Sequence, residues 1–221
     1  MSMGDLRFWS ASSFAYALAI YAQTTGRDWY VASMLPVTFP WPLPPHLRAF
    51  DAAEDDEEEQ SSGSGFKKLA PDTLVAPGAG ARRRTSFDMV AEGGFPPFVL
   101  EVVSSSSVTR DEQEKRRSYD LLGAEEYVVF MPHEGQPSIL TAWGCGESGR
   151  FEPWPADAEG ALWSEVLELF IVARGERVMA RTVEGVLLLT PEEEADGRRQ
   201  AEDEVARLRA EIEHLRRGDK A

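Results

Sequence analysis

The sequence is poor in cysteine and histidine, and this excludes several kinds of catalytic and metal site. Among its 221 residues, Cys145 is the single cysteine, so no disulfide can form within the chain and nothing indicates an oxidising compartment. The three histidines, His46, His133 and His214, do not match the ligand spacing of a zinc site. No histidine lies close in sequence to the serines at residues 104–107, so a turn leading into a helix explains them better than an activated nucleophile does.

A long hydrophobic run is also missing. The most apolar N-terminal run, residues 14–22, is nine residues long, whereas a helix that spans a bilayer needs about 20. The run lacks a preceding cationic segment and follows Asp5, so a signal peptide is not predicted. We therefore expect a soluble, cytoplasmic protein that does not contact a membrane.

Positive charge is scarce and unevenly spread. The formal net charge is −15, and residues 51–65 hold seven acids and no base. Mutual repulsion of these carboxylates, together with serine and glycine, predicts a disordered insertion at 51–65, which is either simply solvated or acts as a DNA mimic or regulatory flap. Residues 66–117 hold nine Lys and Arg against seven acids. Because phosphate contacts supply most of the affinity for nucleic acid, the overall charge argues against general DNA binding.

The stretch from residue 98 to residue 130 predicts a strand, a helix and a second strand. Residues 98–104 and 126–132 are short apolar runs, as expected of strands buried on both faces. Between them, residues 109–122 form the predicted helix, with Thr109 and Glu112 as a capping box and Gly123 as the end. This order over about 30 residues is typical of a βαβ unit.

Other segments complete a predicted α/β fold, in which helices flank a mixed sheet. A helix is expected at 12–24, ended by Gly26, and one or two strands at 29–39, before the proline-rich residues 40–45. Further strands are expected at 68–77, 138–143 and 183–189. Residues 165–173 are expected to form another element, which the sequence does not assign to helix or strand.

The C-terminal part of the chain changes character, so we divide the chain into a body, residues 1–190, and a charged helical tail, residues 191–221. Apolar residues in the tail step by four, three, four and three, which is a heptad pattern. A helix this short is only marginally stable alone in water, so we expect it to pair with a second copy or to pack on the body. Of the two, we predict a homodimer, which would bury the apolar seam. The apolar seam is Ala201, Val205, Leu208, Ile212 and Leu215, flanked by Arg207, Arg209, Glu211, Glu213 and Arg216.

Two acids occupy apolar strand contexts. Glu101 lies inside an apolar strand, where an unpaired charge costs several kcal/mol. Asp72 follows Pro71 and is also flanked by apolar residues. Two carboxylates on neighbouring strands can approach only if a positive charge lies between them, and Mg²⁺ accepts one or two carboxylates with water and phosphate oxygens.

A lysine on the predicted helix completes the constellation. Asp111, Lys115 and Tyr119 are spaced by four and share one helix face. If the helix packs across the sheet, Lys115 can point toward Glu101. A lysine beside a metal-bound water can orient that water and stabilise charge on a phosphate.

In this order, Asp72, Glu101 and Lys115 resemble the PD-(D/E)xK nuclease superfamily. Pro71-Asp72 is the first half of its motif. The position where the lysine normally stands holds Val103, on the same side of the strand as Glu101, so Lys115 looks like a displaced replacement. The further acid that many such enzymes carry on the first helix is missing from residues 14–25, where only Gln23 could substitute.

A closer resemblance is to the Uma-two (Uma2) family of restriction endonucleases. Its pattern of Pro-Asp, Glu-Val-x-Ser, Asp-x-x-x-Lys-x-x-x-Tyr, Gly and Glu-Tyr is met in order here. The terminal strand and the threonine-proline-glutamate step into a charged helix also look like that family. The matching residues are Pro71-Asp72, Glu101 to Ser104, Asp111-Lys115-Tyr119, Gly123 and Glu126-Tyr127.

The resemblance implies a restriction-endonuclease-like fold and a metal-dependent endonuclease that acts on DNA. Asp72 and Glu101 would hold Mg²⁺ or Mn²⁺, and Lys115 would position the attacking water. Arg82, Arg83, Arg84 and Ser104 are candidates for contacts with the substrate.

Structural explanations remain open for each residue. Asp72 could cap a turn, Glu101 could pair with one of the arginines 82–84, and Lys115 could be a solvated partner of Asp111. At the level of function, the alternatives are a catalytically silent interaction module acting through the tail and a hydrolase of small phosphoesters, which would suit the acidic charge.

Overall fold

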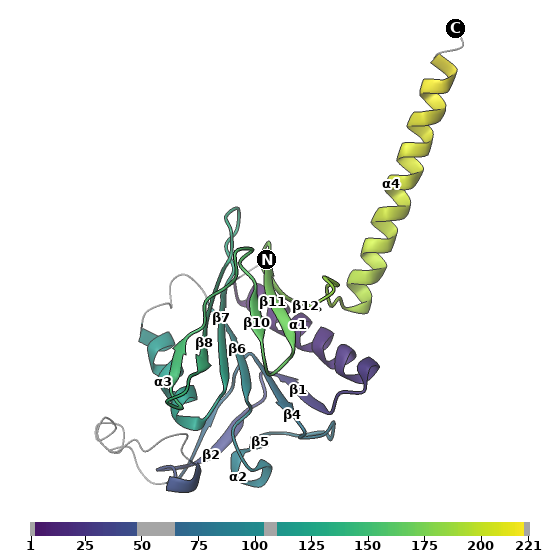
Figure 1. The fold of residues 1–221 in the computed structure, drawn as a ribbon. Coiled ribbons are helices and arrows are strands. Elements are labelled where there is room, and N and C mark those ends of the chain that lie inside the picture. Colours follow the sequence, from purple (N-terminus) through teal and green to yellow (C-terminus); the bar gives the residue numbers. More distant parts are fainter. Residues whose placement is uncertain (1–2, 48–64, 104–109, 219–221) are drawn as a thin grey trace. The chain divides into compact units, whose positions relative to one another are not determined.

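The computed structural model describes residues 3–47, 65–103 and 110–218 and divides into two units, Met1–Leu188 and Leu189–Ala221 (Figure 1). Most of the predicted insertion at 51–65, the proposed helix cap Thr109 and the substrate candidate Ser104 lie outside the described residues. Among the described helices, none is long and apolar enough to cross a membrane.

A six-stranded mixed sheet forms the centre of the first unit, which confirms the predicted α/β fold class. Strands β6 and β7 are parallel, and every other neighbouring pair in this sheet is antiparallel. In spatial order the strands are β1 (Trp29–Ser33), β4 (Thr73–Pro77), β6 (Phe98–Val102), β7 (Glu126–Met131), β8 (Ile139–Cys145) and β9 (Phe151–Pro153).

The predicted βαβ unit is present at the middle of this sheet. Helix α3 (Arg110–Leu122) connects β6 to β7, and all five residues of β6 are buried. The helix ends where predicted, at Gly123, whose φ of 87° lies in the left-handed region. There the N–H groups of Gly123 and Ala124 both donate to the carbonyl of Tyr119.

One face of the sheet is covered by helix α1 (Met3–Thr25) and a small sheet of β10 (Leu162–Ser164), β11 (Leu169–Arg174) and β12 (Arg177–Arg181). Phe14 of α1 packs against Phe98 with ring centroids 6.4 Å apart. Phe98, Leu100 and Val102 of β6 all point to this face. Alternation along the strand therefore sends Val99 and Glu101 to the opposite face.

That opposite face is covered by α3 and a second small sheet, with β2 (Val37–Trp41) between β3 (Gly65–Leu69) and β5 (Phe87–Asp88). Its core joins aromatic side chains of β2 to Val99 of β6 and Tyr127 of β7. The short elements η1 (Pro45–Leu47) and α2 (Met89–Glu92) complete this side.

Two strand boundaries near prolines differ from those predicted. The segment 68–77 is not one strand, because β3 ends at Leu69 and β4 begins at Thr73, with Pro71 and Asp72 at the break. Conversely, β2 continues through Pro40, which the sequence interpretation placed outside the sheet. Pro40 pairs with Phe66 on one side only, beyond the two residues that pair with β5, so its missing N–H breaks no ladder bond.

The strand predicted at 183–189 is wrong. Its branched apolar residues Val183 and Val186 are more than 60% exposed, and only an isolated bridge joins Leu187 to Arg181. A turn occupies the segment, with the N–H of Gly185 donating to the carbonyl of Thr182 and a φ of 88° at the glycine. The strand lies earlier, at β12, where alternate residues point into the core.

The second unit is a single helix, α4 (Pro191–Gly218), of 28 residues. Thr190 and Glu193 form a reciprocal capping box: the backbone N–H of Thr190 donates to the Glu193 carboxylate at 2.7 Å, and the N–H of Glu193 donates to the Thr190 hydroxyl at 3.3 Å. Pro191 takes the first helical position, where its lack of an N–H costs nothing. Val205, Leu208 and Ile212 of the predicted seam are 45–50% exposed in this chain.

Replacing Phe98 by alanine tests the central packing between α1 and the sheet. Phe98 is fully buried, so Phe98→Ala is expected to lower the free energy of unfolding by about 3–5 kcal/mol in urea denaturation. Phe66→Ala is the matched control, because Phe66 is 76% exposed, and it is expected to change stability by less than about 0.5 kcal/mol. Equal effects of the two substitutions would contradict this packing.

Candidate active site

The two acids of the proposed metal site lie opposite each other on β4 and β6. Thr73 pairs with Leu100, and continuing this antiparallel register by one residue places Asp72 opposite Glu101. Both acids are buried, with 1% and 0% of their surface exposed. Directly opposed residues project from the same face with Cβ atoms about 4.5–5.5 Å apart, so the register brings the two carboxylates together.

Hydrogen bonds from two backbone N–H groups and one hydroxyl hold Asp72 at the break between β3 and β4. Its Oδ2 accepts the N–H of Val102, the residue after Glu101, at 2.8 Å. Its carbonyl accepts the N–H of Met34 at 3.2 Å and the hydroxyl of Ser33 at 2.8 Å. The carboxylate of Asp72 is therefore held against β6 by the N–H of Val102.

Helix α3 supplies two donors to Glu101, one helical turn apart. Nζ of Lys115 lies 3.1 Å from Oε2, and the hydroxyl of Tyr119 donates to Oε1 at 2.7 Å. Tyr119 is fully buried, whereas the Lys115 side chain is 23% exposed. Lys115 therefore pairs with Glu101 rather than being a purely solvated residue; the side chain of Asp111 is not among those described.

The electrostatics of the site are dominated by burial. Burial raises the pKa of Glu101, and the neighbouring Asp72 raises it further, while Lys115 and the hydrogen bond from Tyr119 oppose the rise. Burial, and then the adjacent Glu101 carboxylate, hold the pKa of Tyr119 well above its usual value. Tyr119 thus stays protonated and acts as a hydrogen-bond donor rather than a base.

A second buried acid, Glu126, shows what a structural carboxylate looks like in the same sheet. It accepts hydrogen bonds from the Ser164 hydroxyl and from the backbone N–H groups of Glu165 and Val166, which attaches β7 to β10 and the turn after it. Burial raises the pKa of Glu126 too. Glu101 differs, because a second carboxylate lies opposite it and one of its donors is a cationic side chain that reaches solvent.

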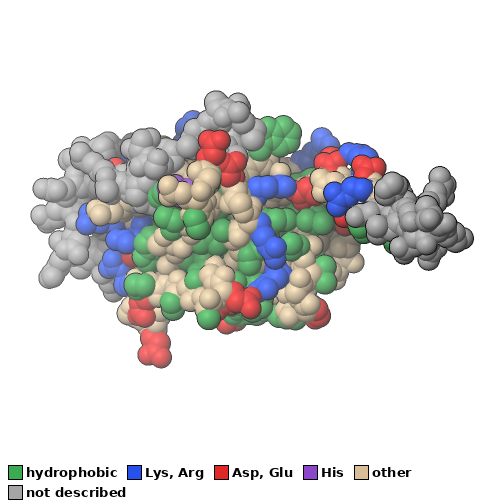
Figure 2. All heavy atoms as spheres, turned by 90° about the horizontal axis from the view of Figure 1, so that it is seen from above, with side chains coloured by type: hydrophobic (Ala, Val, Ile, Leu, Met, Phe, Trp, Pro, Cys, Tyr) green, Lys and Arg blue, Asp and Glu red, His purple; other side chains and the backbone are tan. Residues whose placement is uncertain are grey.

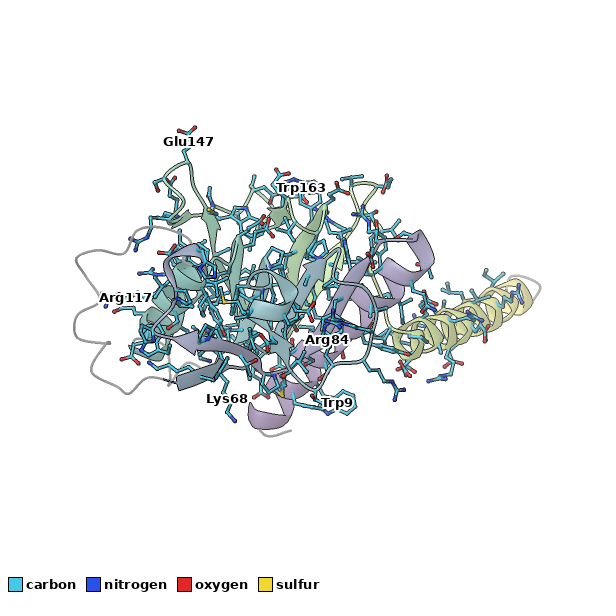
Figure 3. All side chains as sticks on the ribbon, turned by 90° about the horizontal axis from the view of Figure 1, so that it is seen from below. Trp9, Lys68, Arg84, Arg117, Glu147 and Trp163 are labelled. Carbon is cyan, nitrogen blue, oxygen red and sulfur yellow. The ribbon has the colours of Figure 1, made fainter. Side chains whose placement is uncertain are left out.

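The structure does not bring the arginine candidates to these acids. Arg84, labelled in Figure 3, forms a two-pronged ion pair with Glu92, with Nε–Oε1 and Nη2–Oε2 distances of 2.8 and 2.9 Å. Its guanidinium carbon also lies 4.0 Å from the ring centroid of Tyr30. Arg82 also pairs with Glu92. Arg84 further donates to carbonyls in the turn after β4, at the strand end away from Asp72. Of the three, Arg83 is the residue left exposed without such a described pair.

Sequence reasoning placed Tyr119 on the face of Lys115 but gave it no role. The spacing of four from Lys115 was the signal that it too could reach Glu101. The role of Glu92 as the partner of the arginines had no comparable signal, because Glu92 ends α2, eight and ten residues after Arg84 and Arg82. Gln23, the proposed substitute for a helix acid, is exposed on α1, which covers the other face of the sheet.

The donor set fits a hard divalent cation. Asp72 and Glu101 offer carboxylate oxygens from two adjacent strands, and Mg²⁺ or Mn²⁺ would take its remaining ligands from water and phosphate. A closed zinc site does not fit, since in the described part of the chain no three His, Cys, Asp or Glu residues gather to hold a metal. Asp72 and Glu101 lie opposite each other with Lys115 in contact with Glu101, so a bound cation would add to the positive charge that offsets the two carboxylates.

Comparison with known proteins identifies one family. A family model, Uma2, described as "Putative restriction endonuclease", matches residues 2–146. The matched part runs from α1 to the end of β8 and includes Asp72, Glu101, Lys115 and Tyr119. No curated protein matches the chain.

Removing the amine of Lys115 tests whether it offsets the buried charge. Lys115→Met leaves the Glu101 carboxylate beside Asp72 without its cationic partner, and is expected to cost about 1–3 kcal/mol of unfolding free energy in EDTA. Adding Glu101→Gln should restore most of that loss, as a double-mutant cycle from urea denaturation would show. Additive effects would contradict direct coupling between the two residues.

The pair between Arg84 and Glu92 gives a pH-dependence that can be measured separately. The hydrogen bond from Arg84, assisted by Arg82, lowers the pKa of Glu92 to about 2. In the unfolded chain the pKa of a glutamate is about 4.3. The stability that this pair contributes is therefore present above that pH and is lost as the pH falls toward 2. Glu92→Gln should therefore show a smaller loss of stability over this window than wild type.

An exposed residue, Glu134, supplies the control for this measurement. Glu134→Gln should follow the wild-type curve of unfolding free energy against pH. If Glu92→Gln and Glu134→Gln give parallel curves between about pH 4.3 and 2, the pair does not contribute as described.

Proposed function

Because the chain belongs to the Uma2 family, we propose that it is a divalent-metal-dependent endonuclease that hydrolyses phosphodiester bonds of DNA. The observation that carries this proposal is the placement of Asp72 opposite Glu101, with Lys115 in contact with Glu101. We assign the activity to the cytoplasm, since a single cysteine does not suggest an oxidising compartment.

Each residue of the site has a separate role in this proposal. Asp72 and Glu101 hold the cation, Mg²⁺ or Mn²⁺, which when bound supplies Lewis acidity at the phosphate and a more acidic water. The ammonium group of Lys115 has three donors, so it can contact Glu101 and still orient a water or a phosphate oxygen. Tyr119 is a positioning residue, because it fixes Oε1 of Glu101.

The charge around the site favours an anionic substrate despite the acidic chain. Lys67 and Lys68 belong to β3, which ends three residues before Asp72, and Arg116 and Arg117 follow Lys115 on α3. Lys68 and Arg117 are labelled in Figure 3. On the face drawn in Figure 2, Lys and Arg side chains form a few separate groups, with acidic and hydrophobic side chains between them. Phosphates of DNA would meet this basic region, whereas the acids of residues 51–59 account for much of the net charge.

We further propose that α4 joins two copies of the chain as a parallel coiled coil. In the heptad frame set by Val205 and Leu208, Glu204 would face Arg209 of the second copy. An antiparallel pair would place glutamates opposite glutamates. A symmetric dimer would carry two sites, as cutting both strands of a duplex requires.

A second candidate is a catalytically silent member of the family that acts as an interaction module through α4. The observation in its favour is that Glu101 is fully buried and that each of its carboxylate oxygens already accepts a hydrogen bond. This arrangement would also suit a purely structural ion pair. Catalysis therefore has to be measured directly.

Cleavage of supercoiled plasmid DNA with Mg²⁺ or Mn²⁺ is the test of the proposed activity. Wild type should cleave, and Asp72→Asn, Glu101→Gln and Lys115→Met should each lose at least about 100-fold in rate. Lys115→Met should still bind Mn²⁺, measured by electron paramagnetic resonance, whereas Asp72→Asn should not. Glu114→Gln, which removes an exposed acid from the same helix, is the control and should remain active.

The outcome also separates the candidate functions. Metal-dependent cleavage of a small phosphodiester but not of DNA would point to the small-phosphoester alternative. No metal-dependent cleavage of either substrate by folded wild-type protein would favour the silent module.

Light scattering at tens of micromolar tests the dimer. The full chain should have twice the monomer mass, and a chain ending at Thr190 should be monomeric. Leu208→Glu, on the seam, should dissociate the dimer, while Ala206→Glu, off the seam, should not. A monomeric full chain would exclude the dimer, and dimerisation that survives truncation would move the interface to the first unit.

A further inference from the structure

A cavity of about 560 Å³ opens beside the small sheet of β10, β11 and β12. Its volume falls in the range of pockets that hold small organic molecules. The walls come from β11, the end of β12, the loop before β10 and the turn before β8. Except for Pro137 and Ser138, the lining residues follow residue 146, where the match to the family model ends.

The register of the small sheet decides which of its side chains share a face. Ile171 and Ala180 pair with each other and are buried in the core, so alternation turns Phe170, Arg174 and Arg181 to the outer face. Arg181 is paired with Phe170, four residues before Arg174. The two arginines of the lining therefore lie on one face, with their Cα atoms about 14 Å apart.

The side chain of Arg181 extends from β12 across β11 to the loop before β10. Its guanidinium carbon lies 5.0 Å from the ring centroid of Phe170 on β11. Its Nη1 lies 3.4 Å from Oε2 of Glu159, in that loop. Because β11 stands between β12 and β10, these two contacts place the guanidinium over the outer face of β11, where the cavity opens.

The described residues leave the guanidinium of Arg181 incompletely bonded. Its Nε is buried and has no hydrogen-bond partner among them. The ion pair with Glu159 is long, and the Glu159 side chain is 73% exposed, so this pair holds the guanidinium only weakly. A guanidinium is a planar fork that suits two oxygens of one anion. An anion in the cavity would supply the acceptors that Arg181 lacks.

The charges around the cavity favour an anion with more than one negative charge. The lining has two arginines, Arg174 and Arg181, against one acid, Glu159. Arg177 stands directly opposite Arg174 and adds positive charge at the hairpin, which Glu176 in the turn offsets in part. A phosphate monoester carries a charge of about −1.5 to −2 at pH 7, whereas a carboxylate or a phosphodiester carries a single charge. The monoester is the better match to two arginines.

We propose that this cavity binds the phosphate monoester group of an organic molecule. The guanidinium of Arg181 takes the phosphate oxygens, and Arg174 adds positive charge from the other end of the cavity. Glu159 moves into the solvent that it already faces. The small sheet packs on the α1 face of the main sheet, whereas Glu101 points toward α3. The site is therefore separate from the proposed active site and does not depend on the nuclease function.

Calorimetric titration with adenosine 5′-monophosphate and with inorganic phosphate tests the site. The full chain is kept in EDTA, so that no metal at the proposed active site can bind the phosphate. Arg181→Gln should weaken binding of both probes by at least about 10-fold, because hydrogen bonds to a charged group are lost. Arg181→Lys should also weaken it, because lysine keeps the charge but not the fork. Arg198→Gln, on the exposed surface of α4, is the matched control and should bind like wild type.

A substitution of Glu159 tests the position of the anion. Glu159→Gln removes the carboxylate that competes for Arg181, and should strengthen binding by about 2–5-fold, the value of an exposed ion pair. Glu165→Gln makes the same change of charge at an exposed position after β10 and should leave binding unchanged. Equal effects of the two substitutions would show that overall charge, rather than this cavity, controls binding, and would overturn the proposal.

Two sources of the phosphate monoester are told apart by comparing ligands. Adenosine without its phosphate should not bind. If a 5′-phosphorylated oligodeoxynucleotide binds more tightly than the same strand without the phosphate, and Arg181→Gln removes the difference, the site receives the end of a DNA strand. If the two strands bind equally while the mononucleotide binds through Arg181, a free small molecule is the ligand. Failure of both phosphate probes to bind wild type at millimolar concentration, or binding that Arg181→Gln leaves unchanged, would overturn the proposal.

Discussion

The buried carboxylate of Glu101 is the constraint on which the rest of the site depends. A charge at a fully buried strand position is tolerated only with donors at hand, and both described donors come from α3. This requires α3 to cover the face of the sheet toward which Glu101 points, and the crossover from β6 to the parallel β7 places α3 there. The opposite face is then left to the apolar residues of β6, which pack under α1.

Local patterns in the sequence were enough to predict this unit. The apolar runs of β6 and β7, the helix between them and the stop at Gly123 are all short-range signals, and the spacing of Lys115 and Tyr119 follows from helix geometry. The sequence could not predict the register between strands that lie far apart along the chain. That Asp72 stands opposite Glu101 depends on pairing of β4 with β6 across about 30 residues, for which the motif order was the only guide. The false strand at 183–189 shows the converse, since β-branched residues also occur in exposed turns.

The arginine run shows how charge can mislead when its partners are unknown. Three consecutive arginines suggest a phosphate-binding surface, yet Glu92 and the ring of Tyr30 occupy the guanidinium of Arg84. This pair links α2 to the turn after β4, where Arg84 also donates to the carbonyls of Ala79 and Gly80, so Arg84 is not available to substrate. The basic group that the structure does bring to the acids is Lys115 of α3.

Lys115 links the structural and the catalytic interpretation of the site. A residue that only offset Glu101 would be best buried, because a buried pair is least screened by water. Lys115 instead keeps 23% of its side chain exposed while its Nζ contacts Oε2. Its remaining donors can therefore reach a water or phosphate without breaking the pair with Glu101. Tyr119, fully buried and held protonated, has no such access, so the same helix turn separates a group that can meet the substrate from one that only holds Glu101 in place.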